Sequence, residues 1–291
     1  MIGILFKALL AAALFVCVVT ATRFWMSAAG SPHMEHIRRR SGGRVWLWVL
    51  SEAVSCLAAM LVSFFLYPAF LFAGRWLPEP RPGDPGPPVL FVHGVFHTAS
   101  AWLFFTRWFR RAEHLSLYVW TYASFSTDFE VLLEKLAARV RRVQERHPGH
   151  KVVLVGHSLG GLLIRALLNR PEAADLAACA VTLGAPHQGS VLAGLGFSAL
   201  ARGLKYRGPL IQRIEAAQAP PPVPALSIYT PVDNMVIPPE GARIRVPGWV
   251  ELETDPVSHV WLLYHRPAAD AALSFIAAAL RGEAAGNGAG G

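Results

Sequence analysis

Residues 151–165 read Lys-Val-Val-Leu-Val-Gly-His-Ser-Leu-Gly-Gly-Leu-Leu-Ile-Arg and join a buried-strand pattern to a helical one. Residues 152–155 form an uninterrupted apolar run rich in valine, which is typical of a parallel strand covered on both faces. Gly156 and Gly160 lie two residues to either side of Ser158, and glycine permits the close backbone approach that a sharp turn requires. The stretch therefore predicts a strand, a tight turn carrying Ser158, and a helix.

A serine on such a turn is presented at the carboxyl edge of a sheet. There the free amides of the first helical turn and the positive end of the helix dipole can stabilise an oxyanion. A glycine-rich helix start with a chance serine would produce the same Gly-x-Ser-x-Gly pattern. The strand before it, the helix after it and a further glycine at Gly161 favour a catalytic Ser158.

The composition of the N-terminal region, residues 1–77, predicts a membrane anchor. Of the 291 residues 53% are hydrophobic, and the excess is concentrated in two long apolar stretches, 2–22 and 45–74. Each carries a single charge, Lys7 in the first and Glu52 in the second, and such stretches favour transmembrane helices over buried core helices. Glu52 lies about two turns into its helix, so we expect it near the membrane interface, the alternative being a functional intramembrane carboxylate.

The formal net charge of +8 does not indicate nucleic-acid binding, because the basic excess gathers in the loop between the two apolar stretches. Glu35 is the only acid in that loop, which contains five arginines: Arg23, Arg38, Arg39, Arg40 and Arg44. By the positive-inside rule the loop is cytoplasmic, and both termini lie outside the cytoplasm. A cleaved signal peptide over 1–29 is the competing interpretation, but it would leave these arginines outside and break the rule.

A proline-rich linker over 78–88 separates the anchor from a region in which strand and helix patterns alternate. This alternation predicts one doubly wound α/β domain over 89–282, with a mostly parallel six-stranded sheet. Residues 283–291, mostly glycine and alanine, are expected to form a disordered tail. Helices are expected at 99–114, 128–147 and 268–280, and strands at 89–92, 117–122, 152–155, 178–183, 225–229 and 248–252.

Three motifs carry a resemblance to a known family. They are His93-Gly94-Val95 after the first strand, Gly156-His157-Ser158-Leu159-Gly160-Gly161 at the turn, and Thr182-Leu183-Gly184-Ala185-Pro186-His187-Gln188-Gly189-Ser190 after the next strand. With these, residues 88–282 resemble the α/β-hydrolase fold and, within it, the compact bacterial lipases and esterases. The resemblance implies a serine carboxylic-ester hydrolase that forms an acyl-enzyme on Ser158. With the anchor, it implies a multi-pass protein of the bacterial inner membrane whose hydrolase domain is periplasmic or extracellular.

A serine hydroxyl needs a general base and a group that orients it, and in this fold the acid and then the histidine follow the serine. Asp233, four residues past the strand at 225–229, is the expected acid, although an Asx turn would also explain it. His259 follows the last strand and is the expected base. His265 is the competing histidine and Asp255 the fallback acid.

The resemblance also assigns the residues around the triad. The backbone amides of Leu159 and Val95 are the expected oxyanion donors, because each directly follows a motif residue at a strand end. The supporting residues are His93, Gly94, Gly156, His157 and Gly160. No cofactor and no metal are expected, since the sequence has neither a cysteine-histidine cluster nor a Gly-x-Gly-x-x-Gly loop.

Residues 189–224 separate two strands by more than an ordinary crossover needs. They are expected either to form a mobile apolar lid over the acyl pocket or to be a helix with a long connection. A lid beside a membrane anchor would suit lipid esters as substrates. The alternatives are a thioesterase or acyltransferase on the same triad and a non-catalytic, membrane-tethered interaction module.

Overall fold

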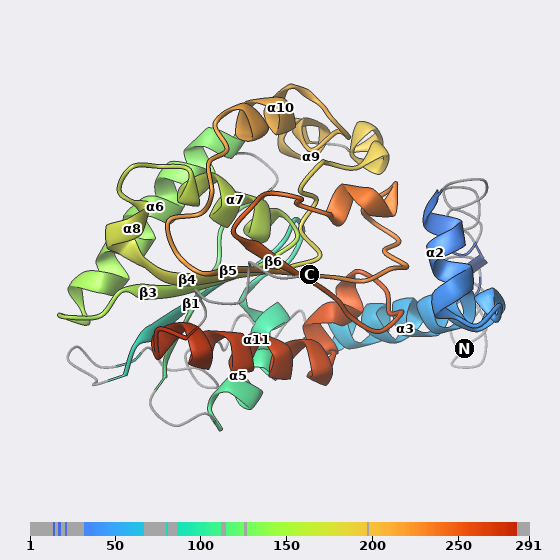
Figure 1. Ribbon diagram of the computed structural model, residues 1–291, viewed down its shortest axis with the longest axis horizontal. Coiled ribbons are helices and arrows are strands. Elements are labelled where there is room, and N and C mark those ends of the chain that lie inside the picture. The colour runs from blue at the N-terminus through green and yellow to red at the C-terminus, as the bar shows by residue number, and fades with distance from the viewer. Residues whose placement is uncertain are drawn as a thin grey trace, which may run out of the picture.

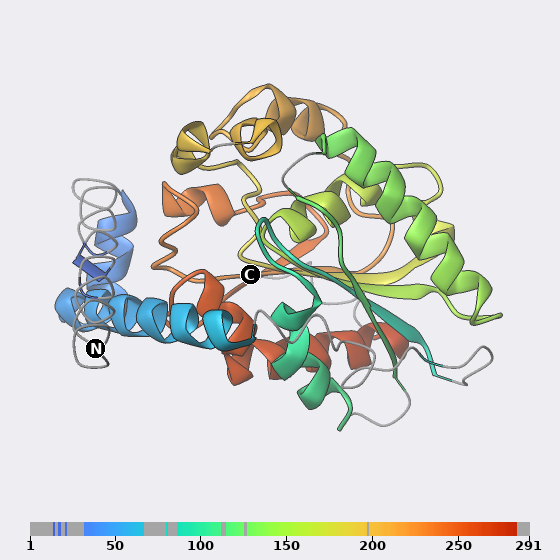
Figure 2. The same cartoon turned by 180° about the vertical axis from the view of Figure 1, so that it is seen from behind.

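The computed structural model describes residues 14, 17–18, 21, 32–66, 80, 86–111, 115–124, 127–196 and 198–283. Its centre is a six-stranded sheet in the order β2-β1-β3-β4-β5-β6, and every neighbouring pair is parallel (Figures 1 and 2). The strands are β1 (Pro88–Val92), β2 (Ser116–Trp120), β3 (Val152–His157), β4 (Ala177–Leu183), β5 (Ala225–Tyr229) and β6 (Trp249–Glu253). The six predicted strands are confirmed, each shifted by no more than two residues at either end.

The central strands are apolar without alternation because both faces of the sheet are covered. All residues of β1 and β3 are buried. Successive side chains point to opposite faces, so Leu90 and Val92 enter one core whereas Val89 and Phe91 enter the other. The continuous apolar run in each strand thus supplies two separate helix layers.

Helices form a layer on each face of the sheet (Figure 1). One layer contains α6 (Phe129–Glu145), α7 (Leu159–Leu168), α8 (Ala173–Leu176), α9 (Ala199–Gly203) and α10 (Pro209–Ala216). The other contains η2 (Ala99–Trp102), α5 (Leu103–Phe109), η5 (Val260–Tyr264) and α11 (Arg266–Leu280). Two further 3₁₀ turns, η3 (Val191–Leu195) and η4 (Pro239–Ala242), lie in connections near the carboxyl ends of the strands.

The helix expected over 99–114 is instead divided into η2 and α5, which ends at Phe109. The division falls at Trp102, whose backbone (φ −95°, ψ 6°) departs from α-helical geometry. Its ring is fully buried, with its centroid 5.0 Å from that of Phe91 and 5.4 Å from that of Phe105. The helix is interrupted at Trp102, where this large ring packs against the sheet.

The N-terminal region is described in part. Most of the first predicted span, 2–22, and the end of the second, 67–74, lie outside the described residues. Within the described part, α2 (Pro32–Arg40) precedes α3 (Val45–Leu66), and α3 is the one helix there that is long and apolar enough to cross a membrane. The two-helix anchor therefore remains a prediction. One face of α3 packs against the hydrolase-like domain, and α3 contacts η5 (Figures 1 and 2).

Two valines of α6 test the assignment of its buried face. Val140 is fully buried, whereas Val131 is 44% exposed on the same helix. We expect Val140→Ala to lower the free energy of unfolding by about 2 kcal/mol, because it removes two methyl groups from a packed core. Val131→Ala should change it by no more than about 0.5 kcal/mol. Urea unfolding of both variants measures the difference, and equal losses would contradict the assignment.

Candidate active site

Ser158 lies between β3 and α7 with φ 53° and ψ −121°, a strained conformation for a residue with a side chain. The strain is possible because the surrounding backbone is close-packed. A Cβ on Gly160 would lie 2.1 Å from the carbonyl oxygen of Val92, and one on Gly156 would lie 2.6 Å from the carbonyl carbon of Gly160. The turn therefore requires glycine at both positions, and it holds Ser158 at the carboxyl edge of the sheet.

The sheet order brings the motif after β1 to the same place. β1 pairs with both β2 and β3, so its carboxyl end lies where the connections diverge to opposite sides of the sheet. Such a switch point forms a crevice in open α/β sheets. Gly94 lies so close to the nucleophile candidate that a Cβ on it would be 2.9 Å from the Cβ of Ser158. Val95 follows directly.

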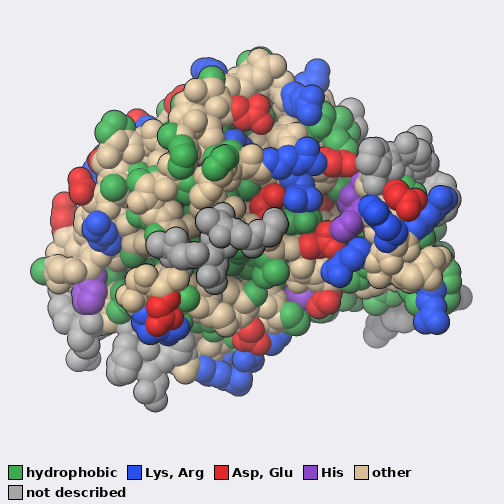
Figure 3. Space-filling view, viewed as in Figure 1, with side chains coloured by type: hydrophobic (Ala, Val, Ile, Leu, Met, Phe, Trp, Pro, Cys, Tyr) green, Lys and Arg blue, Asp and Glu red, His purple; other side chains and the backbone are tan. Residues whose placement is uncertain are grey.

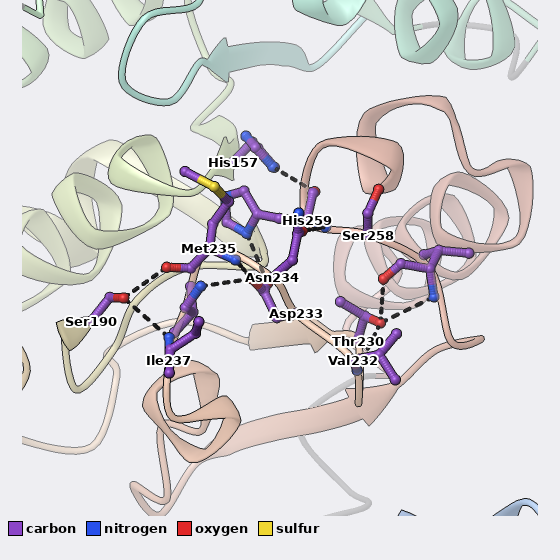
Figure 4. Close-up of polar contacts among 12 residues, drawn as sticks. His157, Ser190, Thr230, Val232, Asp233, Asn234, Met235, Ile237, Ser258 and His259 are labelled. Atoms are coloured by element: carbon purple, nitrogen blue, oxygen red, sulfur yellow. Dashed lines mark hydrogen bonds and ion pairs between the residues drawn. The ribbon is translucent and has the colours of Figure 1, made fainter. Parts of the chain in front are cut away.

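Asp233 follows β5, and its buried carboxylate accepts three hydrogen bonds. Oδ1 accepts from the amides of Met235 at 2.8 Å and Val236 at 2.7 Å, whereas Oδ2 accepts from His259 Nδ1 at 2.7 Å (Figure 4). Asp233 thus makes both the Asx turn, through Oδ1, and the contact with His259, through Oδ2. The turn fixes the carboxylate and leaves Oδ2 facing the imidazole.

His259 follows β6, and three contacts fix its position. Its amide donates to Asn234 Oδ1 at 3.0 Å, and its carbonyl accepts from His157 Nε2 at 3.2 Å (Figure 4). The rings of His157 and His259 lie 4.7 Å apart between centroids. Since Nδ1 is engaged by Asp233, Nε2 is the ring nitrogen that remains to exchange a proton.

Ser158 and His259 line the same cavity, of about 330 Å³. Val95 also lines it, and Leu159, the first residue of α7, is buried beside it. The first amides of a helix have no carbonyl partner within the helix. The N–H of Leu159 can therefore donate a hydrogen bond to an oxygen of a ligand. Apart from these residues, the walls are mostly apolar: Phe96, His97, His157, Pro186, Ser190, Leu192, Ala193, Gly196, Ala201, Leu204, Met235, Val236 and Val260.

Residues 189–224 contribute η3, α9 and α10 and supply part of this cavity wall, through Leu192, Ala193, Gly196, Ala201 and Leu204. Ser190 joins the segment to the acid loop: its hydroxyl donates to the Met235 carbonyl at 2.7 Å and accepts from the Ile237 amide at 3.1 Å. The segment therefore covers the candidate site. Its movement as a lid remains a prediction.

Burial keeps the histidines around His259 neutral. Desolvation lowers the pKa of His93 to about 4 and of His97 to about 4, and it holds the pKa of His157 well below its usual range. His93 is satisfied as a neutral ring, because Nδ1 donates to the Gly94 carbonyl at 2.8 Å while Nε2 accepts from the Tyr122 amide at 3.2 Å. These rings support the loops without adding charge beside His259.

The competing residues form a pair of their own. His265 Nε2 lies 3.0 Å from Asp255 Oδ2, and His265 occupies the position before the first turn of α11. Neither residue lines the cavity that contains Ser158. The structure brings Asp233, not Asp255, to His259. Among the residues it describes, no group of three or more His, Cys, Asp or Glu is placed to hold a metal ion.

Sequence reasoning missed the contribution of α3 to this site. The Ser258 amide donates to Ser55 Oγ at 2.8 Å, directly before His259. Asn234, directly after Asp233, donates from Nδ2 to Cys56 Sγ at 3.4 Å. An apolar helix outside the sheet domain thus contacts both the loop of Asp233 and the loop of His259. The signal available in the sequence was the polar side of this apolar helix, formed by Ser51, Ser55 and Ser63.

Glu52 lies on the same side of α3, and the structure places it in an interior contact rather than at an exposed edge. Its side chain is fully buried and close enough to Asp233 to interact electrostatically. Neither carboxyl oxygen has a hydrogen-bond partner among the described residues. Glu52 is therefore buried, because the face of α3 that carries it packs against the domain, and its position near the membrane interface stays a prediction.

Comparison with known proteins agrees with this fold. Residues 89–286 match the model of the alpha/beta hydrolase family. The chain belongs to that family. The mature form of a Bacillus licheniformis lipase has a similar fold, with a TM-score of 0.54 and 20% identity over 68% of this chain and 95% of that one. An Aspergillus fumigatus lipase B has a TM-score of 0.55 and 17% identity over 66% of this chain and 52% of its own.

The alpha/beta hydrolase match begins at residue 89, so α2 and α3 lie outside the part of the chain that the family accounts for. The contacts from Ser55 and Cys56 to the acid and base loops are accordingly a feature of this chain rather than of the family domain. At 20% identity or below, the two lipases establish the fold, and the chemistry of this site rests on its own residues.

The buried histidines allow a test that does not depend on activity. We expect the imidazoles of His93 and His97 to remain neutral as the pH falls from 8 to about 5, because desolvation disfavours their charged forms. Nitrogen chemical shifts of histidine-labelled protein would follow each ring, with His93→Gln and His97→Gln providing the assignments. Titration of either ring near pH 6.5, the value for a solvated imidazole, would contradict this account.

Proposed function

We propose that this alpha/beta hydrolase cleaves carboxylic esters through an acyl-enzyme formed on Ser158. The observation that carries the proposal is the 2.7 Å hydrogen bond from His259 to Asp233, made where His259 shares a cavity with a serine on a strained turn. A buried carboxylate fixed by two amides holds the imidazole with Nδ1 protonated. That tautomer leaves Nε2 free to accept a proton from the nucleophile.

In the first half-reaction, Ser158 Oγ attacks the carbonyl carbon of the ester while its proton passes to His259 Nε2. The negative charge on the resulting tetrahedral oxygen is stabilised by the amides of Val95 and Leu159. Asp233 stabilises the imidazolium without taking its proton. When the bond to the alcohol breaks, Nε2 returns that proton to the alcohol oxygen, and the acyl group stays on Ser158.

In the second half-reaction, water takes the place of the alcohol. His259 Nε2 accepts a proton from the water as its oxygen attacks the acyl carbon, and a second tetrahedral oxyanion forms in the same position. Its collapse breaks the bond to Ser158, whose Oγ recovers the proton from Nε2. The products are a carboxylic acid, which ionises at neutral pH, and regenerated enzyme.

The cavity supports an ester with a hydrocarbon chain as the substrate. Its walls are built mainly from small and branched apolar side chains, several of them from residues 189–224. A charged or strongly polar acyl group would lose hydration there without gaining partners. A lipase or esterase activity therefore suits the site better than action on polar esters, and the lipases with a similar fold support the same class.

The location in the bacterial inner membrane and the export of the hydrolase domain remain predictions. They rest on the arginines between the two apolar stretches and on the positive-inside rule, which assigns the loop and the domain to opposite sides only if α3 crosses the bilayer. The first of the two stretches lies largely outside the described residues.

The proposal is tested by labelling with a fluorophosphonate, which reacts with activated serines, and by nitrophenyl esters of graded chain length. We expect labelling and release of free acid by the wild type, and loss of both in Ser158→Ala, because alanine has no hydroxyl to form the acyl-enzyme. The matched control is Ser41→Ala, in the turn between α2 and α3, which should retain both. Folded wild type that neither labels nor hydrolyses any ester of the series would refute the proposal.

A further inference from the structure

A second, larger cavity of about 650 Å³ lies beside the nucleophile cavity. It is formed between the C-terminal half of α3 and the segment that follows β1. Phe96 and His97 line both cavities, so the two are neighbours with a shared wall. The remaining lining residues are mostly aromatic or aliphatic: Met60, Ser63, Phe64, Phe65, Ser100, Ala101 and Tyr264.

The outward face of α3 next to this cavity is apolar and exposed. Phe64 and Phe65 are each 74% exposed, and Trp46, Val54 and Leu61 are more than half exposed on the same helix. A soluble protein rarely presents so continuous an apolar surface to water, and such a surface marks a site of contact with another apolar phase.

The inward face of α3 is bonded to the hydrolase domain over much of its length. Ser51 Oγ donates to the Pro256 carbonyl at 2.6 Å, and Ser63 Oγ lies 2.9 Å from the hydroxyl of Tyr264. At 1.5 Å per residue these two contacts are about 18 Å apart along the helix. A bilayer-spanning α3 would therefore draw the adjoining domain into the hydrocarbon.

The adjoining surface is unsuited to hydrocarbon. Arg266 and Asp270 form an ion pair at the start of α11, which begins two residues after Tyr264, and both are about half exposed. Charged groups are costly at the centre of a bilayer. A helix that lies in the membrane plane, by contrast, buries its apolar face in the boundary region and leaves the attached domain in water.

We propose that α3 lies in the plane of the membrane and that the cavity at its C-terminal end takes the acyl chain of a bilayer lipid. This inference rests on the proposed ester hydrolysis and assigns its substrate class: a long-chain lipid ester drawn from the leaflet. The chain enters between Met60 and Phe65 and reaches Ser158 past Phe96 and His97.

Phe96 is placed to control that passage. It is one of four described non-glycine residues with positive φ, at 63°, and its amide donates to Ser124 Oγ at 3.0 Å. Its side chain lies in the shared wall of the two cavities and is 44% exposed. A strained residue held at the junction of two cavities is typical of a clamp on a ligand.

The basic end of the N-terminal region fits the headgroups of the same leaflet. Arg38, Arg39, Arg40 and Arg44 are exposed where α2 ends and α3 begins, and Figure 3 shows basic side chains gathered over that end of the molecule. Glu253 pairs with Arg40 and Glu35 with Arg39, and the charges of Arg38 and Arg44 leave the cluster with a positive excess. Basic residues beside an interfacial helix attract anionic lipids.

The test compares hydrolysis of a long-chain phospholipid in vesicles with hydrolysis of a short, water-soluble nitrophenyl ester by the full chain. The double variant Val54→Glu, Leu61→Glu places charge on the outward face of α3. We expect its ratio of vesicle rate to soluble-ester rate to fall at least tenfold, most clearly in vesicles containing phosphatidylglycerol. Val131→Glu, on the exposed face of α6, is the matched control and should preserve the ratio.

The outcomes separate this inference from the proposed function. Wild type that hydrolyses neither substrate refutes the ester hydrolase itself. An unchanged ratio in the double variant refutes the lipid-facing α3. Met60→Trp should shorten the preferred acyl chain in the nitrophenyl series, because it narrows the second cavity. An unchanged chain-length preference would overturn the assignment of that cavity.

Helix orientation can be measured directly with a nitroxide amino acid placed in turn at Leu47, Val54 and Leu61, which are seven residues apart. In a spanning helix, the depths of successive positions in the bilayer would differ by about 10 Å. An in-plane helix gives nearly equal, shallow depths at all three. A steep depth profile along the three positions would contradict the proposal.

Discussion

The hydrogen bond between His259 and Asp233 is the interaction on which the rest of the site depends, because it joins two loops that the chain order keeps apart. Each partner is also fixed from its own side. Two backbone amides hold the second oxygen of Asp233, and Asn234 holds the amide of His259. The imidazole therefore has one orientation and one tautomer before a substrate arrives, and little reorganisation is left for the reaction.

The two faces of the helix α3 differ in what they contact. Its inward face contacts Asn234 and Ser258, the residues next to Asp233 and His259, and its outward face is apolar. A movement of the helix would thus shift the residues next to Asp233 and His259. The buried Glu52 lies on the same contact face and adds a carboxyl group to the surroundings of Asp233. Under the proposal that α3 lies on a membrane, lipid contact and the positions of Asp233 and His259 are coupled through this one helix.

The sequence was sufficient for the sheet because parallel strands covered on both faces must be continuously apolar, as β1 and β3 are. The glycines around Ser158 identified the turn for an equally local reason. The same reasoning did not reveal the packed side of α3, because its composition is that of a membrane helix as a whole. Ser51, Ser55 and Ser63 share that side, but their partners lie about 200 residues away in the chain. The buried ring of Trp102, which divides η2 from α5, likewise depends on long-range packing.

The most direct measurement of the central claim is kcat/KM for a soluble nitrophenyl ester in Asp233→Asn and Asp255→Asn. The account predicts a loss of about 10³-fold to 10⁴-fold in Asp233→Asn, because the amide cannot hold the imidazole in the required tautomer. It predicts little change in Asp255→Asn, whose carboxylate pairs with His265. A large loss in Asp255→Asn with activity retained in Asp233→Asn would contradict it.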